Sequence, residues 1–414
     1  MLDVSVLYAG LETPSTPHRY GRAITQIDPP EHQRMALARS AKERRPIVVW
    51  NLTRTCNLKC VHCYTQSEAR KYDGELSTDQ CKRVLDDLAA FKVPAVLFSG
   101  GEPLVRKDVL ELAAYARGLG LHVVLSTNGT LIDHDTAQKL KDLKFAYVGI
   151  SLDSATPSIH DEFRGVRGAF EKTMKGFRHC VDVGQKVGLR LTLTRQTCKD
   201  LDAIFDFIED NGINRACFYH LVPAGRGISL DALSKAESRK AVDTIFTRTN
   251  DLVDRGKGVE VLMVDNHCDG PHLYRRMLAE DHPRAAQVLD MLLFNGGAQF
   301  SSGVAIADID PLGDVHADQF SMDRSFGNVK DRDFSDIWTD LSNPVMAKFK
   351  DRLPHLTGRC ATCRYKAICG GSLRARAENA TGDLWAPDPS CYLTDDEIAG
   401  EPIELTVNQN TISS

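Results

Sequence analysis

The chain has 414 residues, of which 42% are hydrophobic and 26% are charged, and its formal net charge is −5. This composition is that of a globular protein and excludes a chain dominated by disorder. The mild acidity argues against a nucleic-acid partner, which requires a basic face. No apolar run approaches the ~20 residues of a membrane span, and the start of the chain lacks the basic region of a secretory signal. We therefore expect a cytoplasmic protein that does not act on a membrane.

From residue 46 onward, short apolar runs alternate with helical patterns. The first helix begins at a capping box formed by Ser77 and Gln80, and the second runs from Asp108 to about Gly118. Such alternation predicts βα units on a parallel sheet. The six predicted strands cover residues 47–52, 95–99, 121–126, 146–151, 187–193 and 216–221.

Six βα units fit an incomplete (β/α)6 barrel of the TIM type, and a doubly wound sheet is the alternative. Both α/β folds place active residues at the carboxyl ends of the strands. Residues 235–293 are predicted to be mostly helical, with a loop at 264–271, and the chain is loop-rich from residue 294. The predicted segments are an N-terminal arm (1–45), a partial barrel (46–230), a helical bridging region (231–299), a loop-rich domain (300–396) and a tail (397–414).

Cysteine is the most informative residue type, with 12 in the chain. Thiols stay reduced in the cytosol, so cysteines at fixed spacing indicate metal sites before disulfides. The first group, Cys56, Cys60 and Cys63, follows the first predicted strand with the spacing C-x3-C-x2-C. Three thiolates can hold three corners of a cuboidal [4Fe–4S] cluster and leave one iron open for a ligand. Zinc, with His62 as the fourth ligand, is the alternative.

The second group consists of four cysteines with the spacing C-x2-C-x5-C-x21-C. Four thiolates saturate one [4Fe–4S] cluster or one zinc ion, and the spacing alone does not decide between them. Its members are Cys360, Cys363, Cys369 and Cys391. We expect the five scattered cysteines to be small packing or surface side chains: Cys81, Cys180, Cys198, Cys217 and Cys268.

Polar groups gather at the ends of three predicted strands. The second strand ends in Gly100, Gly101 and Glu102, where the glycines let the backbone approach a ligand and the carboxylate favours an ammonium group. The third strand ends beside Asn128, and the fourth ends at Ser151-Leu152-Asp153. Their hydroxyl, amide and carboxylate groups suit a ribose, although Asx or ST turns use the same residues.

The three-cysteine loop and the Gly-Gly-Glu-Pro strand end together resemble the radical S-adenosylmethionine (SAM) enzymes, over roughly residues 46–225. The resemblance implies that the first cysteine group binds a [4Fe–4S] cluster whose open iron is chelated by SAM. The segment 100–102 would receive the amino group of SAM, and Arg164 would meet its carboxylate. Further contacts to SAM are implied for Asn128, Ser151 and Asp153. Reduction of the cluster then cleaves SAM to a 5′-deoxyadenosyl radical, which takes a hydrogen atom from the substrate.

The second cysteine group resembles the SPASM extension of these enzymes, and the segments 327–329 and 334–338 also match it. This extension often binds two auxiliary clusters. Residues 309–318 keep the Ile-x-Pro-x-Gly-x-Val pattern of the other cluster site but contain no cysteine. The resemblance therefore implies a C-terminal SPASM-type domain with one auxiliary cluster, fully ligated by Cys360, Cys363, Cys369 and Cys391.

Motifs along nearly the whole chain resemble radical SAM enzymes of tetrapyrrole synthesis, including segments 20–22, 48–52, 264–267, 313–316, 374–378 and 385–389. The resemblance implies that acetate side chains are removed from 12,18-didecarboxysirohaem to give Fe-coproporphyrin III. The alternatives are haem d1 synthesis, in which propionates of the same substrate react, a peptide maturase, and a non-catalytic iron–sulfur carrier.

An iron macrocycle with several carboxylates requires arginines around an apolar slot and could use an axial imidazole. The candidate arginines are Arg22, Arg226, Arg374 and Arg376, and the candidate imidazoles are His18, His220, His267 and His316. We also expect an external electron donor of the flavodoxin or ferredoxin type and a monomeric enzyme.

Overall fold

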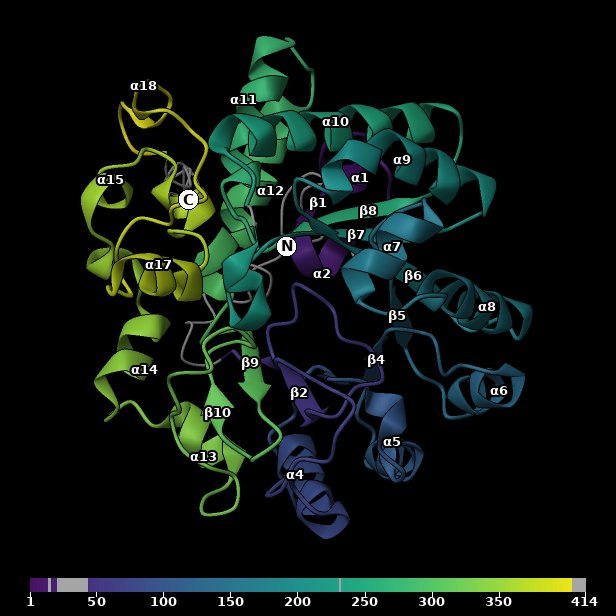
Figure 1. Cartoon of the computed structure of the whole chain (residues 1–414). Coiled ribbons are helices and arrows are strands. Elements are labelled where there is room, and N and C mark those ends of the chain that lie inside the picture. The colour runs from purple at the N-terminus through teal and green to yellow at the C-terminus, as the bar shows by residue number, and fades with distance from the viewer. Residues whose placement is uncertain (14–15, 21–43, 231, 404–414) are drawn as a thin grey trace, which may run out of the picture.

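The computed structural model describes residues 1–13, 16–20, 44–230 and 232–403. One ten-stranded sheet, in the order β1-β8-β7-β6-β5-β4-β3-β2-β9-β10, organises these residues (Figure 1). Neighbouring strands from β2 to β8 are parallel, and β9 adds in parallel beside β2. The strands are β1 Leu2–Asp3, β2 Ile47–Thr53, β3 Val96–Gly100, β4 Val123–Thr127, β5 Tyr147–Ser151, β6 Val187–Leu193, β7 Arg215–His220, β8 Glu260–Val264, β9 Ile306–Ile309 and β10 Val315–His316.

The six predicted strands are β2 to β7, and the α/β partial barrel is confirmed. Helices α1 and α2 precede these strands, and helices α4 to α10 alternate with them and lie outside the curved sheet (Figure 1). They are α1 Val4–Leu7, α2 Thr16–Tyr20, α4 Thr78–Ala90, α5 Val109–Gly118, α6 His134–Asp142, α7 Pro157–Arg164, α8 Ala169–Asp182, α9 Leu201–Asp210 and α10 Lys235–Asp254. The capping box at the start of α4 is present, since the Ser77 side chain accepts from the Gln80 amide and the Gln80 side chain accepts from the Ser77 amide.

One parallel strand was not predicted from the sequence. β8 lies in the segment expected to be helical, and it pairs in parallel with β7 and antiparallel with β1. Its sequence, EVLMV, is a five-residue run that is apolar apart from Glu260. Such a run lacks the alternation that distinguishes a strand from a buried helical turn. The strands of the sheet therefore come from the first four predicted segments. The boundaries between these segments stay a prediction.

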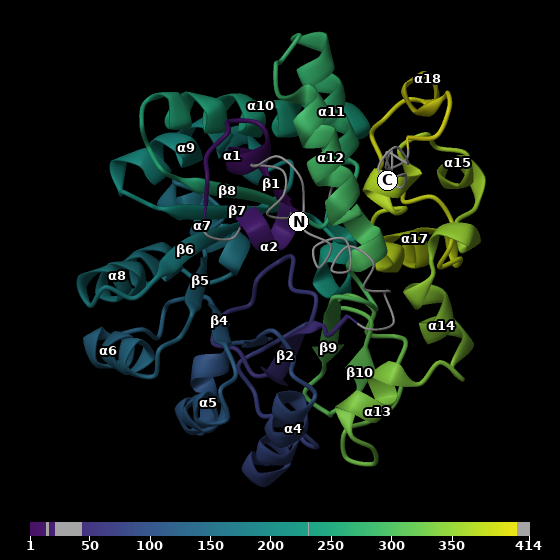
Figure 2. The ribbon, with the colours of Figure 1, turned by 180° about the vertical axis from the view of Figure 1, so that it is seen from behind.

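The C-terminal part packs along one side of the sheet and consists of loops and short helices. Seen from behind, α11 and α12 lie between the strands and this part, and both contact α16 (Figure 2). The helices from α11 to the end of the described chain are α11 Asp269–Ala279, α12 Ala285–Asn295, α13 Phe334–Thr339, α14 Pro344–Lys350, α15 Gly358–Ala361, α16 Lys366–Cys369, α17 Arg374–Thr381 and α18 Asp395–Ile398. None of the helices in the described part of the chain has the length and apolar content of a membrane span.

Candidate active site

The first cysteine group lies in the loop that follows β2, and neighbouring segments hold this loop by its backbone. The amide of Lys59 donates to the Arg164 carbonyl at 3.2 Å, and the amide of Val61 donates to the Phe163 carbonyl at 3.0 Å. From the other side, the Arg226 amide donates to the carbonyl of Cys63 at 3.0 Å. The end of α7 and the turn after β7 therefore fix the position of the thiols.

Two glycines permit this close approach. Gly165, which ends α7 with φ +70°, has no room for a side chain, because a Cβ would come within 2.3 Å of the Lys59 carbonyl oxygen. Gly225, with φ +54°, would place a Cβ 2.4 Å from the Tyr64 carbonyl oxygen. Only glycine combines left-handed backbone conformation with such contacts.

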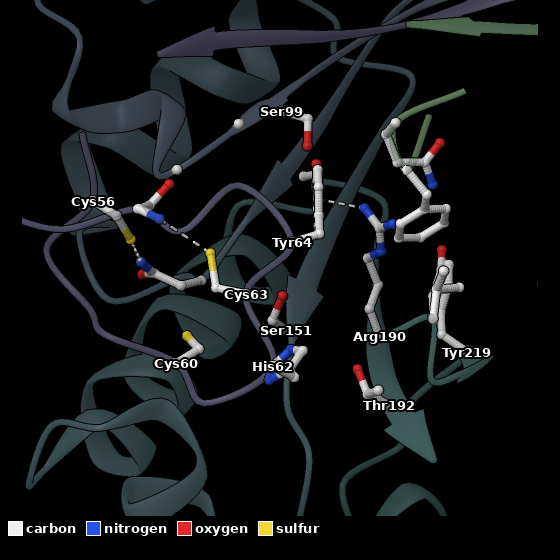
Figure 3. Close-up of a pocket in the computed structure, with 18 of the residues that line it drawn as sticks. Cys56, Cys60, His62, Cys63, Tyr64, Ser99, Ser151, Arg190, Thr192 and Tyr219 are labelled. Carbon is white, nitrogen blue, oxygen red and sulfur yellow. Dashed lines mark hydrogen bonds between the residues drawn. The ribbon is translucent and has the colours of Figure 1, made fainter. Parts of the chain in front are cut away.

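One pocket at the carboxyl ends of the strands brings most of the predicted residues together (Figure 3). It is lined by the three thiols of the first cysteine group. From the neighbouring strand ends it receives Gly100, Gly101, Asn128 and Ser151, and from the end of α7 it receives Arg164. Parallel strands end at the same edge of a sheet, which explains why residues far apart in sequence meet here.

Glu102 is the first predicted SAM residue that does not line this pocket. Its carboxylate is fully buried and accepts hydrogen bonds from the Thr127 hydroxyl and the Asn128 amide, both at 2.8 Å. Burial raises the pKa of Glu102, although these hydrogen bonds oppose the effect. The side chain thus ties the end of β3 to the end of β4, and Gly100 and Gly101 face the ligand space.

Asp153 also lies behind the pocket, where it holds Arg164. Its carboxylate stands 2.5 Å from a guanidinium nitrogen of Arg164, and both side chains are buried. Burial raises the pKa of Asp153, but the attraction of Arg164, His62 and His160 outweighs it and leaves that pKa below its usual value. Another guanidinium nitrogen of Arg164 lies 3.6 Å from the Cys60 sulfur. Arg164 is therefore oriented between a fixed anion and the thiol loop.

The buried thiols of the first cysteine group need the positive charge of bound iron before they can ionise and act as ligands. Burial raises the pKa of Cys56 to about 12 and also raises that of Cys60, against the attraction of Arg164. These thiols become ligands only when they lose their protons on binding iron. Within the described residues, no three His, Cys, Asp or Glu side chains converge closely enough to hold a single metal ion. The three thiols line one side of an open pocket, which leaves space for a cluster and a ligand bound to it.

The second cysteine group surrounds a separate pocket in the C-terminal part, as the four-thiol prediction requires. A fifth thiol, Cys268, lines the same pocket. Cys268 is fully buried, and its hydrogen bond to Cys391 lowers the pKa of Cys391 to about 7, although burial opposes this shift. Sequence reasoning treated Cys268 as a scattered packing residue. Its place in the Val-Asp-Asn-His-Cys segment was the available signal.

Two of the predicted substrate residues line the first pocket. His220 has its Nε2 2.9 Å from an Asp269 carboxylate oxygen, so one ring nitrogen is already engaged. Arg226 donates to the Cys60 carbonyl at 2.8 Å and to the Ser67 carbonyl at 3.1 Å. Its guanidinium therefore supports the cysteine loop. Arg22 and the side chain of His18 lie outside the described residues.

Four other predicted substrate residues do not line this pocket. Arg374 donates to the Leu384 and Ala386 carbonyls, and Arg376 pairs with Asp388 at 2.9 Å. These partners hold the C-terminal loops together, so Arg374 and Arg376, the candidate substrate arginines, are engaged away from the first pocket. His316 has its Nδ1 2.8 Å from the Arg324 carbonyl oxygen, while burial lowers the pKa of His267 well below its usual value.

The pocket also contains residues that sequence reasoning missed. Arg190 comes from β6, Tyr219 from β7 and Asp265 from the turn after β8, while Phe320 comes from the C-terminal part. Arg190 sits within an alternating strand pattern, where a polar residue reads as a solvent-facing position. Barrel closure turns that face inward.

Fold and site together define an enzyme that binds SAM at a three-thiol iron–sulfur cluster. The model of the Radical SAM superfamily matches residues 50–208, and the chain belongs to this superfamily. It is 50% identical to Fe-coproporphyrin III synthase of Methanosarcina barkeri over 96% of this chain and 99% of that protein. It is 41% identical to pre-heme d1 synthase of Dinoroseobacter shibae over 84% of this chain and 87% of that protein.

A solved structure supports the architecture. SuiB of Streptococcus suis, crystallised with S-adenosylmethionine, superposes with a TM-score of 0.67. The alignment covers 92% of this chain and 86% of SuiB, at 18% sequence identity. At this identity the likeness concerns the fold, which here includes both the partial barrel and the C-terminal part.

Proposed function

We propose that this protein removes acetate side chains from 12,18-didecarboxysirohaem and so yields Fe-coproporphyrin III. The observation that carries the proposal is the 50% identity to Fe-coproporphyrin III synthase over nearly the full length of both chains. A likeness of this extent includes the residues beyond the SAM site, where substrates are distinguished. The predicted cofactors are SAM and two [4Fe–4S] clusters, one open and one auxiliary.

When bound, SAM and the open cluster supply a 5′-deoxyadenosyl radical that abstracts a hydrogen atom. The chain's own residues bind and orient these groups. Cys56, Cys60 and Cys63 would hold the cluster, and the backbone at Gly100 and Gly101 would receive the amino group of SAM. The strand ends enclose the pocket and limit the access of water to it.

The auxiliary cluster would be held by Cys360, Cys363, Cys369 and Cys391. Four thiolates leave no open coordination position, so this cluster would transfer electrons or stabilise the C-terminal part. We propose a flavodoxin- or ferredoxin-type electron donor, because iron–sulfur clusters exchange single electrons. We further propose a monomeric, cytoplasmic enzyme. Sedimentation of the holoprotein would test whether the enzyme is monomeric.

Anaerobic incubation with SAM, a reductant and 12,18-didecarboxysirohaem tests the function. We expect Fe-coproporphyrin III to appear together with 5′-deoxyadenosine. Unchanged tetrapyrrole in a preparation with both clusters intact would contradict the proposal. A product that has kept its acetates and lost carbon from its propionates would favour the pre-haem d1 reaction, for which the 41% identity over 84% of the chain is the supporting observation.

A further inference from the structure

Arg190 is a half-buried cation of the active-site pocket for which the preceding assignments give no role. It lies on β6, and its guanidinium donates a hydrogen bond to the Ser126 hydroxyl on β4. The guanidinium carbon lies 4.7 Å from the centroid of the Tyr219 ring. A cation–π contact of this kind orients a guanidinium without neutralising its charge.

The other arginines that line the pocket have their charge or donors engaged. Arg164 pairs with Asp153, and Arg226 donates to two backbone carbonyls. Within the described residues, no carboxylate lies within the 4.0 Å of an ion pair with Arg190, whose neighbours besides Ser126 are the uncharged side chains of Tyr219, Tyr147, Tyr64 and Cys217. A half-buried cation without an ion pair favours an anion supplied from outside the chain.

The surroundings of Arg190 suit a flat, apolar ligand that carries acid groups. Tyr64 and Phe320 line the same pocket, with ring centroids 5.4 Å apart in an edge-to-face arrangement. In Figure 3, Arg190 and Tyr219 lie on one side of the pocket, and Cys56, Cys60 and Cys63 lie on the other. A ligand held by Arg190 would therefore extend toward the cluster side.

We propose that Arg190 is a specificity-determining residue that binds a side-chain carboxylate of the tetrapyrrole substrate. This inference rests on the proposed function, since it names how the same site recognises that substrate. The fork of a guanidinium matches the two oxygens of a carboxylate, and the hydrogen bond to Ser126 and the ring of Tyr219 fix its direction. The substrate carboxylate replaces the counter-ion that the chain lacks here.

Binding of Fe-coproporphyrin III and of its methyl ester to the anaerobic holoprotein with SAM tests this role. The shift of the tetrapyrrole absorption band reports the dissociation constant. We expect Arg190→Met to weaken binding of the free acid about tenfold or more, since a charge-assisted pair is lost. Arg190→Lys should recover part of this loss. The methyl ester should bind wild type and Arg190→Met equally.

SAM affinity and iron content should match wild type in both variants, which separates loss of a contact from misfolding. Arg178→Met, an exposed arginine on α8, is the matched control and should bind like wild type. Equal affinity of wild type and Arg190→Met for the free acid would overturn the inference. Weakened SAM binding in Arg190→Met, with unchanged tetrapyrrole binding, would assign the anion site to SAM and also overturn it. Failure of wild type to bind the free acid would instead overturn the proposed function.

Discussion

At the scale of single residues, the Arg164 guanidinium is the best-oriented cation for SAM. Asp153 holds it at 2.5 Å, and the pocket receives its other face. We expect Arg164→Met to weaken SAM binding about tenfold or more, because a charge-assisted contact to the carboxylate is lost. Titration of the cluster's electron paramagnetic resonance (EPR) signal with SAM measures this. Arg332→Met, which removes an exposed pair with Asp340, should leave SAM binding unchanged.

Arg164→Met should also change how the stability of the fold depends on pH. In wild type the pKa of Asp153 lies below its unfolded value, so its ionised form stabilises the fold above that value, and the contribution is lost as pH falls. Without Arg164, burial dominates and the pKa of Asp153 rises. The melting temperature of Arg164→Met should therefore fall further below that of wild type at pH 8 than at pH 5. An equal difference at both pH values would contradict this electrostatic role.

Cys268 is a second residue whose role appears only in three dimensions. Its thiol donates to the Ser390 carbonyl at 3.9 Å and interacts with the neighbouring Cys391 at the auxiliary pocket, and such polar contacts to ligating sulfurs raise the reduction potential of a cluster. We expect Cys268→Ala to make the auxiliary potential more negative and leave the open cluster unchanged, as measured by an EPR-monitored redox titration. Cys180→Ala, which removes a buried thiol on α8, is the control. An unchanged auxiliary potential in Cys268→Ala would rule the contact out.

The contrast among residues has a physical reason. Cys56, Cys60 and Cys63 could be predicted because they lie close together in one loop, and their pattern resembles the cluster loop of radical SAM enzymes. Arg190 and Cys268 could not, because each joins its site through the closure of the sheet or the docking of the C-terminal part. Sequence spacing carries no record of such contacts.

At the scale of elements, the end of α7 determines the position of the cysteine loop. Gly165→Ala would drive a Cβ to 2.3 Å from the Lys59 carbonyl oxygen, so we expect reduced iron in the open cluster and a normal auxiliary cluster. Mössbauer and EPR spectra distinguish the two. Gly168→Ala is a matched control, because its φ of +78° imposes the same backbone strain but no atom lies within 4 Å of the new Cβ. Equal loss of the open cluster in both variants would show that backbone strain alone causes the loss, without the close approach to Lys59.

The elements themselves were predictable where patterns are long. α4 carries its capping box in the sequence, and β2 to β7 alternate with helices. β8 was missed because its apolar run does not alternate and lies between helical patterns, and β1 because two residues give no period. β8 is identified by its pairing with β7 and β1, and β1 by its pairing with β8.

At the scale of the whole molecule, the chain combines two thiol sites of different openness. We expect about eight iron and eight sulfide per anaerobic holoprotein, as two [4Fe–4S] clusters require. Changing Cys56, Cys60 and Cys63 to Ser together should leave about four of each, with a signal that no longer responds to SAM. Four iron and one zinc in the wild type would show instead that the C-terminal site is a zinc site.

The central claim is that the radical formed at the open cluster removes acetate groups from an iron tetrapyrrole. Its most direct test is mass spectrometry of the tetrapyrrole formed from 12,18-didecarboxysirohaem, with 5′-deoxyadenosine quantified in the same samples. We expect Fe-coproporphyrin III to accumulate in step with 5′-deoxyadenosine. Production of 5′-deoxyadenosine while the acetates of the tetrapyrrole remain in place would contradict the claim.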